Sequence, residues 1–224
     1  MIRPDMATLL AFVGTNASIT PEVARILTFD LAEQSFNRLT VDGDTSTNDS
    51  FMVVASGVGD HEVIRDKESP EYSQLLEGLA PIVRELAMRT VRDAEGATRF
   101  ITIHVHGGRE SSECRRVAYT VAHSPLVKTA LFAGDPNWGR FCMAIGRAGI
   151  NDLDPYGVSL NLDNVRVATG GMVADEYREE DGAEVMAQDE YDITINLGRG
   201  DSKETIWTSD LSYDYVRINA EYRS

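Results

Sequence analysis

The chain has 224 residues, of which 42% are hydrophobic and 25% are charged, a composition typical of a globular protein with its own core. Lys and Arg number 21 against 36 Asp and Glu, so the formal net charge is −15. So acidic a surface repels phosphate backbones and anionic lipid, which argues against nucleic acid and membranes as partners. No apolar run approaches the ~20 residues that span a bilayer, and a signal-peptide pattern is absent. Cys114 and Cys142 form no metal-ligand spacing and fit a reducing compartment, so we expect a cytoplasmic protein.

The first part of the chain predicts two strands and two helices. Residues 8–14 and 51–58 are short apolar runs, which we interpret as buried strands. Thr20-Pro21 is the pattern of an N-cap followed by proline at the first helical position, and apolar residues at helical spacing extend this helix to about Arg38. A longer amphipathic helix covers residues 69–92. Its apolar stripe consists of Leu75, Leu76, Leu79, Ile82, Val83 and Leu86.

The second part is richer in strands. Residues 100–107 alternate, which predicts a strand with one apolar face. That face holds Ile101, Ile103 and Val105, and the opposite face holds Thr102, His104 and His106. Helices are expected next, at residues 117–133 and 135–146. The last third is expected to form strands at 156–168, 191–197 and 204–219, with a helix at 181–189 between the first two. The mixture predicts an α/β or α+β fold that divides near residues 107–115.

Five clusters combine small residues, carboxylates and hydroxyls in places where a core would exclude them. They are MIRPDMAT (1–8), DGDTSTND (42–49), DAEGATR (93–99), SPLVKTALFAGDPNWGR (124–140) and SYDYVRINAEYRS (212–224). None is a Gly-rich phosphate loop, a His-Glu-x-x-His pair or a Gly-x-Ser-x-Gly elbow. In this order they resemble the β chain of the ornithine acetyltransferase (glutamate N-acetyltransferase) family over essentially the whole chain. DGDTSTND and SPLVKTA…GDPNWGR are the most specific parts of the resemblance.

The resemblance implies a catalytic threonine. In that family a precursor cuts itself between Ala and Thr, which here corresponds to the bond between Ala7 and Thr8, and Thr8 becomes the nucleophile. A threonine hydroxyl is a weak nucleophile that needs a proton acceptor. The freed α-amino group of Thr8, with an unperturbed pKa of about 7.7–8.0, can take that proton. Read locally, Thr8 is an ordinary β-branched residue at the start of a strand, and only the other clusters favour the nucleophile.

The resemblance also implies a substrate-binding set made of Thr8, Glu95, Asn219 and Ser224. Glu95 suits the cationic amine of an ornithine side chain, although a carboxylate in a turn is more often simply solvated. Asn219 and Ser224 match pocket-lining positions at the family's C-terminus, although chain ends are usually mobile. Asn219 follows the strand-like YVRI, so we expect its backbone to be held.

Other polar residues carry weaker hypotheses. The three carboxylates and three hydroxyls of DGDTSTND could form a hard-cation site, but we favour a self-hydrogen-bonded turn near the active site. Lys128 and Arg140 are candidates for neutralising an acidic substrate, with structural pairing at least as plausible. His104 and His106 have no third ligand, so packing is favoured. We expect no metal and no cofactor.

Three features depart from the family pattern. The family usually has Asp-Gly-Glu-Gly-Ala-Thr-Lys where this chain has DAEGATR, so Ala94 and Arg99 replace Gly and Lys. Its usual ending, Asn-Ala-Asp-Tyr-Thr-Thr, is NAEYRS here. The family's α half, which brings an oxyanion-hole Thr-Gly pair and a substrate-binding Lys, is absent from this sequence. Because the sequence starts seven residues before the Ala7–Thr8 bond, we expect a fragment, a truncated gene or an uncut piece of a precursor.

The resemblance therefore implies an α/β sandwich of the N-terminal-threonine nucleophile type, with sheets between helices. Residues 1–110 would form the nucleophile-bearing half-domain, completed by the α chain, and residues 111–224 a C-terminal α/β domain. The expected reaction moves acetyl from N2-acetylornithine to glutamate through an acetyl-threonine, in arginine biosynthesis, and acetyl-CoA is a further candidate donor. The expected assembly is an α2β2 heterotetramer. The alternatives are an N-terminal-threonine amidohydrolase or aminopeptidase, and an inactive fragment that only binds a partner.

Overall fold

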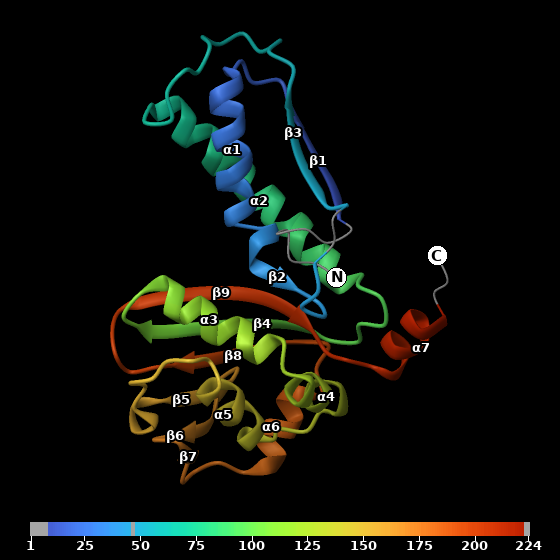
Figure 1. The fold of residues 1–224 in the computed structure, drawn as a ribbon, viewed down its shortest axis with the longest axis vertical. Helices are drawn as coiled ribbons and strands as arrows, with labels where there is room; N and C mark the ends of the chain where they lie inside the picture. The colour runs from blue at the N-terminus through green and yellow to red at the C-terminus, as the bar shows by residue number, and fades with distance from the viewer. Residues whose placement is uncertain (1–8, 46–47, 222–224) are drawn as a thin grey trace. The chain divides into compact units, whose positions relative to one another are not determined.

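The computed structural model describes residues 9–45 and 48–221. The chain forms two compact units, one from residue 1 to 90 and the other from 91 to 224, and each is described by itself (Figure 1). Both units contain helices and strands, and all the described strands of the second unit lie in one mixed sheet. The predicted α/β class is therefore confirmed.

The predicted domain division lies elsewhere in the chain than the division between these units. A boundary after residue 110 falls inside the second unit, between the strand β4 (Phe100–Gly108) and the helix α3 (Ser111–Ala122). This helix packs against β4, and β4 in turn pairs with two later strands. The division into domains at residues 1–110 and 111–224 therefore stays a prediction.

The first unit is built around two parallel strands. β1 (Leu10–Thr15) pairs with β3 (Ser50–Ala55), with Leu10 opposite Ser50. Parallel neighbours need a crossover connection of a dozen or more residues, and the helix α1 (Pro21–Glu33) lies in that connection and packs on β3. Two short elements follow α1 before β3 begins; they are the 3-10 turn η1 (Phe36–Arg38) and the strand β2 (Leu39–Thr40).

The start of α1 is as predicted, whereas its end is not. Thr20 is the N-cap, because its Oγ1 accepts the N–H of Val23 at 3.4 Å, and Pro21 is the first helical residue. The helix stops at Glu33, short of the predicted Arg38. At Ser35 the backbone leaves the helical region, with φ −139° and ψ −92°, and the Ser35 hydroxyl donates instead to the carbonyl of Leu31 at 2.6 Å.

The strands β1 and β3 are buried on one face only. Ala11, on the inner face of β1, is 5% exposed. The opposite face is apolar but open, and the exposed fractions along it are 62% for Leu10, 60% for Phe12, 41% for Met52 and 60% for Val54. The prediction of two buried strands is therefore wrong for this face. An apolar run reveals that a strand has two water-avoiding faces, but it does not reveal what covers them.

The helix α2 (Pro70–Arg92) has the predicted bounds. The Ser69 side chain accepts the N–H of Tyr72 at 3.2 Å and so caps the first turn. Part of the predicted apolar stripe is not buried, because Ile82 is 63% exposed while its neighbour Val83 is fully buried. Among the described residues, no helix is both long enough and apolar enough to cross a membrane.

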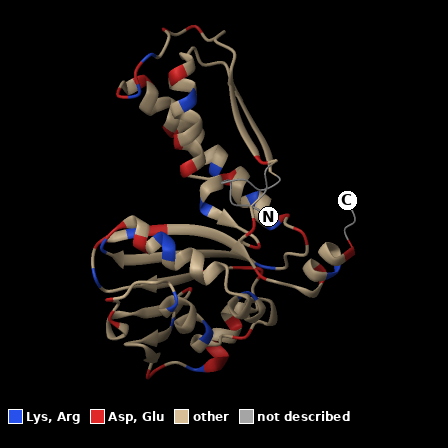
Figure 2. Cartoon of the chain, in the orientation of Figure 1, with Lys and Arg blue, Asp and Glu red and all other residues tan. Residues whose placement is uncertain are grey.

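The second unit contains a mixed sheet whose strands lie in the order β9-β4-β8-β5-β6-β7. The central strand β4 pairs in parallel with β8 (Glu190–Asn196) and antiparallel with β9 (Ser202–Ser209). The remaining elements of this unit are β5 (Ser159–Leu162), β6 (Val165–Thr169), β7 (Met172–Val173), α4 (Pro125–Ala133), α5 (Trp138–Gly146), η2 (Pro155–Gly157), α6 (Glu179–Met186) and α7 (Tyr213–Glu221). In Figure 2 the strands of this sheet are mostly tan, and the acidic first turn of α6 is red.

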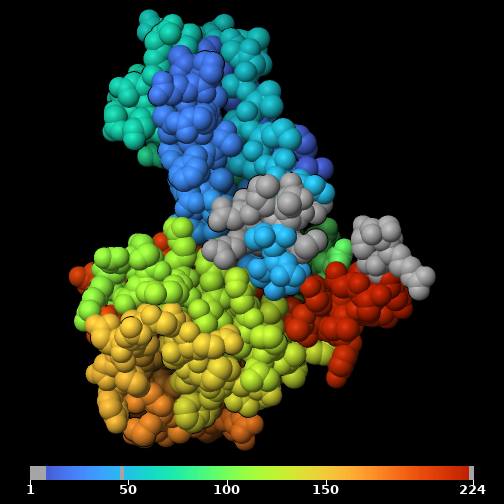
Figure 3. Space-filling model, viewed as in Figure 1, coloured from blue at the N-terminus to red at the C-terminus, as the bar shows by residue number. Residues whose placement is uncertain are grey.

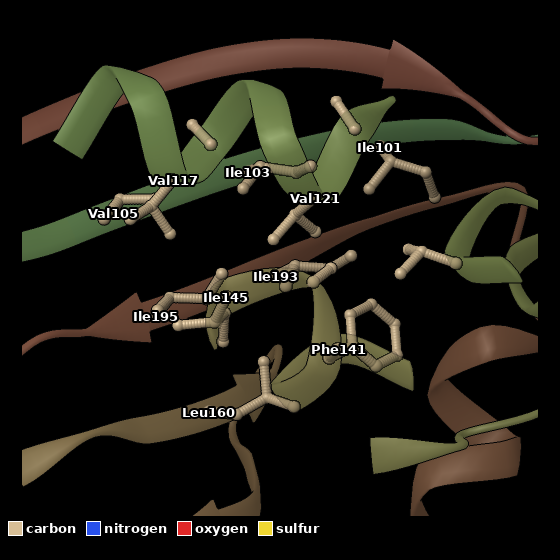
Figure 4. Packing of buried hydrophobic residues seen from close by; sticks show 14 of the residues in the cluster. Ile101, Ile103, Val105, Val117, Val121, Phe141, Ile145, Leu160, Ile193 and Ile195 are labelled. Atoms are coloured by element: carbon tan, nitrogen blue, oxygen red, sulfur yellow. The ribbon is translucent and has the colours of Figure 1, made fainter. Parts of the chain in front are cut away.

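The core of this unit lies on one face of the sheet. Ile101, Ile103 and Val105 are completely buried, which confirms the predicted alternation in β4. Apolar side chains from β4, β5 and β8 meet those from α3 and α5 (Figure 4); the labelled members are Ile101, Ile103, Val105, Val117, Val121, Phe141, Ile145, Leu160, Ile193 and Ile195. β4 and β9 both contribute to this core. The turn at residues 93–99 precedes β4, and residues 210–212 follow β9.

The helices between residues 111 and 146 are divided more often than predicted. The run 117–133 is broken after α3, because Ser124 caps a new helix with its Oγ on the N–H of Val127 and Pro125 cannot continue the old one. The helix predicted to begin at Asp135 begins three residues later, at Trp138. The N–H of Asp135 still bonds to the carbonyl of Ala130, so this residue belongs to the end of α4.

Candidate active site

Two of the predicted site residues lie in the described part of the chain. Ala7, Thr8 and Ser224 fall outside it. Glu95 lies between α2 and β4, and Asn219 lies on α7, 124 positions later, yet Asn219 Nδ2 donates to Glu95 Oε2 at 3.4 Å. Both side chains are exposed. A carboxylate and a carboxamide thus stand together in reach of a small polar ligand.

Asn219 reaches this position from a helix, not from the predicted strand. The YVRI segment has the β-branched and aromatic residues of a strand, but Ser212 Oγ accepts the N–H of Tyr215 at 3.1 Å and caps a helix at this point. Arg217 Nη2 donates to Asp214 in the first turn at 2.9 Å. None of the nine residues of α7 is buried, so no apolar periodicity marked it as a helix. The strand prediction for residues 213–219 is wrong.

Gly96 allows the turn after α2 to touch the start of α7. Its φ is +69°, a conformation that side chains rarely adopt, and a Cβ there would lie 2.3 Å from the backbone nitrogen of Tyr215. The Ser212 hydroxyl donates to the carbonyl of Gly96 at 2.5 Å. Figure 3 shows α7 in red beside the yellow-green of α4, where the rings of Tyr213 and Phe132 are 5.4 Å apart. These contacts bring Asn219 to Glu95.

The turn is also held where it leaves α2. Arg92 donates from Nε and Nη2 to the two carboxylate oxygens of Glu190, at 2.7 and 2.9 Å. This bidentate pair lowers the pKa of Glu190 below its ordinary value. The same guanidinium lies 4.1 Å from the ring centre of Phe100, the first residue of β4. Glu95 therefore sits in a short segment whose first residue is fixed to the sheet.

The DGDTSTND loop has the predicted internal hydrogen bonding in its described residues. Asp42 Oδ1 accepts the N–H of Asp44 at 3.0 Å. At the other end of the loop, Asp49 Oδ1 accepts the N–H of Leu9, the residue that follows Thr8. The expected place of this loop near the active site stays a prediction, because Ala7 and Thr8 lie outside the described residues. Asp49 was not among the predicted site residues, although its place before β3, which pairs with β1, was a usable signal.

Lys128 and Arg140 have structural partners. Lys128 is 3% exposed, and its ammonium donates to Thr208 Oγ1 at 3.3 Å and to the carbonyl of Ser209. Arg140 donates to the carbonyl of Leu126 at 2.9 Å and joins α5 to α4. These hydrogen bonds favour a structural role for both side chains, with hydroxyl and carbonyl acceptors, and a role toward an acidic substrate stays a prediction.

One of the two histidines of β4, His104, contacts both neighbouring strands, whereas His106 packs on His104 itself. His104 Nδ1 lies 2.9 Å from Thr205 Oγ1 of β9, and its Nε2 lies 3.4 Å from a carboxylate oxygen of Asp192 on β8. The ring of His106 packs edge-on against that of His104, with centres 6.1 Å apart. Within residues 9–45 and 48–221, no three His, Cys, Asp or Glu side chains are grouped so that they could hold a metal ion.

Comparisons with known proteins show what this chain is similar to. The sequence pattern of the ArgJ family matches residues 1–224. Proteins named arginine biosynthesis bifunctional protein ArgJ from Psychrobacter arcticus and Pseudomonas syringae pv. tomato are each 51% identical to this chain over 224 residues. All of this chain aligns with 55% of each, so it spans about half the length of these curated relatives.

A solved structure shows the same fold. The crystal structure of arginine biosynthesis bifunctional protein argJ from Bacillus halodurans matches 96% of this chain and 100% of its own chain, with a TM-score of 0.89 and 35% identity. A TM-score of this size over nearly the whole chain means that the two chains share one fold. Together with the match over every residue of the sequence, it leads to one conclusion: the chain belongs to the ArgJ family.

Proposed function

We propose that this chain is the nucleophile-bearing part of an enzyme that moves the acetyl group of N2-acetylornithine to glutamate in arginine biosynthesis. The observation that carries the proposal is the 51% identity to arginine biosynthesis bifunctional proteins over all 224 residues. The chain also has Met-Ala-Thr at residues 6–8, the context in which the family resemblance places the cleavage. The proposed place of action is the cytoplasm, and acetyl-CoA is a second candidate donor.

In the proposed mechanism, cleavage between Ala7 and Thr8 frees the α-amino group of Thr8. With an ordinary pKa of about 7.7–8.0, this amine is partly unprotonated near neutral pH and accepts the hydroxyl proton. The Thr8 Oγ then attacks the acetyl carbonyl of N2-acetylornithine, ornithine leaves, and glutamate takes the acetyl group from the resulting ester. Forming an ester divides one difficult amide exchange into two easier steps. The hydrogen bond from Leu9 N–H to Asp49 supports this role, because it orders the residue next to the nucleophile.

Glu95 and Asn219 are the proposed binding residues for the ornithine side chain, with Ser224 as a further member of the set. An exposed carboxylate that already accepts one neutral hydrogen bond, from Asn219, is well suited to a second partner with positive charge. Hydrogen bonds between charged partners are shorter and about twice as strong as neutral ones. Glutamate has no side-chain ammonium, so the same carboxylate distinguishes the donor from the acceptor.

The proposed partner is the N-terminal part of the longer relatives, the α chain, in an α2β2 assembly. The open apolar face of β1 and β3 supports an occupant, because Leu10, Phe12 and Val54 are each 60% or more exposed. At roughly 25 cal/mol per Å² of apolar surface, leaving several large side chains in water is costly, and covering them would stabilise a complex. The relatives contain a further 45% of chain that could supply the cover, since 55% of their length is matched.

Replacing Glu95 with glutamine should raise the KM for N2-acetylornithine in the complete protein. The lost charge-assisted contact is worth about 1.5–3 kcal/mol, which corresponds to a rise of about 10- to 100-fold. The KM for glutamate should change by less than about twofold, since that substrate has no side-chain ammonium for Glu95 to bind. Steady-state rates of N-acetylglutamate formation give both values.

The matched control is Asp93→Asn, which removes an exposed carboxylate from the same turn. It tests whether the loss of any negative charge near residue 95 is enough to raise the KM for N2-acetylornithine. Equal effects from Asp93→Asn and Glu95→Gln, or normal KM values in Glu95→Gln, would show that Glu95 does not bind the substrate amine. Acetate as the main product, in place of N-acetylglutamate, would favour the amidohydrolase alternative.

A further inference from the structure

The carboxylate of Asp210 is buried directly behind the Glu95 turn. Asp210 follows β9, is 3% exposed and lies 115 residues after Glu95 in the chain. Its Oδ1 accepts the backbone N–H of Thr98 at 2.8 Å and that of Arg99 at 3.0 Å. Its Oδ2 accepts the Thr98 hydroxyl at 2.6 Å. Three donors from two consecutive residues thus converge on one side chain.

This arrangement fixes backbone and not merely side chains. A buried carboxylate is costly unless hydrogen bonds compensate it, and two of its three donors here are main-chain amides. Those amides, at Thr98 and Arg99, lie between the turn and Phe100, where the pairing of β4 with its neighbouring strands begins. Asp210 therefore sets the path by which the chain leaves the turn.

Asp210 is itself held firmly. The Lys128 ammonium donates to the carbonyl of Ser209, just before Asp210, and the N–H of Leu211, just after it, donates to the carbonyl of Lys128 at 3.2 Å. Two residues further on, the Ser212 hydroxyl donates to the carbonyl of Gly96 at 2.5 Å. The segment 209–212 is thus anchored to α4 on one side and grips residues 96–99 on the other.

Glu95 is next to Gly96 in the chain, and its position depends on these contacts. Gly96 has no room for a Cβ against Tyr215, so the turn cannot shift toward α7. Without Asp210, the amides of Thr98 and Arg99 would lose their acceptor, and the exposed turn would be free to move away from α7. A carboxylate that must lie at hydrogen-bond distance from an ammonium loses binding energy when its backbone is displaced by even ~1 Å.

We propose that Asp210 is a positioning residue that fixes the Glu95 turn in the geometry required to bind the side-chain ammonium of the acetyl donor. The inference rests on the proposed binding role of Glu95. Asp210 is buried and does not touch substrate, yet it should affect the KM for N2-acetylornithine and leave the KM for glutamate unchanged.

The test uses Asp210→Asn in the complete protein, with Thr98→Val as a milder second variant that removes the hydroxyl donor and leaves both amides bonded. Asparagine keeps one acceptor oxygen for the two amides, but it loses the negative charge that strengthens these hydrogen bonds and turns an N–H₂ group toward the Thr98 hydroxyl. We expect the KM for N2-acetylornithine to rise about 10-fold in Asp210→Asn, with kcat and the KM for glutamate within about twofold of normal, and a smaller rise of the same kind in Thr98→Val. Hydrogen exchange should quicken about 10-fold or more at the amides of Thr98 and Arg99.

Two comparisons separate positioning from general loss of stability. Ile195→Val, in the fully buried core of β8, lowers the melting temperature without touching the turn, and it should leave both KM values normal. Combining Asp210→Asn with Glu95→Gln should raise the KM for N2-acetylornithine no further than Glu95→Gln alone, because a positioning residue acts through the residue it positions.

The outcomes distinguish this inference from the proposed function. A high KM in Glu95→Gln with a normal KM in Asp210→Asn would overturn the positioning role and leave the function standing. Additive effects in the double variant, or a raised KM in Ile195→Val, would also overturn it. A normal KM in Glu95→Gln would remove the binding role of Glu95 and the inference with it.

Discussion

Replacing Thr8 with alanine should abolish both self-cleavage and acetyl transfer in the complete protein. One hydroxyl is the proposed nucleophile of both reactions, so its removal should stop both. Loss of a nucleophile in enzymes of this kind lowers kcat by about 10⁴- to 10⁶-fold. Cleavage is measured as the appearance of two bands on a denaturing gel, and transfer as the formation of N-acetylglutamate.

Thr28→Ala is the matched control for that experiment. The Thr28 hydroxyl donates to the carbonyl of Ala24 within α1, at 2.8 Å, so its loss removes the same group from the same unit without touching the cleavage point. Cleavage and transfer should both be normal in Thr28→Ala. Two bands on the gel from the Thr8→Ala protein would mean that the nucleophile is another residue.

The 224-residue chain alone should transfer no acetyl group, and the α half should be needed for activity. While residues 1–7 are attached, the nitrogen of Thr8 is an amide whose lone pair is delocalised and cannot accept a proton. By resemblance, the oxyanion donors, each worth about 3–4 kcal/mol of transition-state stabilisation, also come from the α half. Mass spectrometry of the lone chain should show an uncut N-terminus at Met1. Transfer by the purified lone chain would contradict this division of labour between the halves.

The same prediction extends to solubility. The open face of β1 and β3 should make the lone chain poorly soluble, and co-expression of the α half should correct this, while activity also needs a free Thr8. Phe12→Ser should make the lone chain more soluble and weaken its association with the α half, whereas Val58→Ser, at a loop residue that is 76% exposed, should do neither. Sedimentation and co-purification measure the two effects. Equal effects of Phe12→Ser and Val58→Ser would show that the β1–β3 face is not the contact.

The sequence predicted an element well where the local pattern of its residues agrees with the burial of its side chains. β4 alternates strictly because one of its faces lies against the core, and α2 begins where a serine side chain caps a helix before proline. The sequence pattern predicted a strand for α7 because its β-branched and aromatic residues favour a strand, whereas the Ser212 side chain caps a helix. With no buried face, α7 offered no periodicity to decide between them.

The site could be predicted from sequence only in part. Glu95 and Asn219 were named by resemblance to a family, and no local pattern relates two residues 124 positions apart. Asp49 and Asp210 were not named, because a single aspartate beside a strand looks the same whether it faces water or accepts backbone amides. Their roles depend on which segments the fold brings next to them, and that information is not local.

The most direct test of the proposed nucleophile is to find the acetyl group on Thr8. The cleaved protein is mixed with N2-acetylornithine in the absence of glutamate, quenched in acid, digested and analysed by mass spectrometry. The peptide that begins at Thr8 should carry one acetyl group as an ester, and adding glutamate before the quench should remove it and yield N-acetylglutamate. Acetyl found on a different residue, or steady transfer with Thr8 never acetylated, would contradict the mechanism.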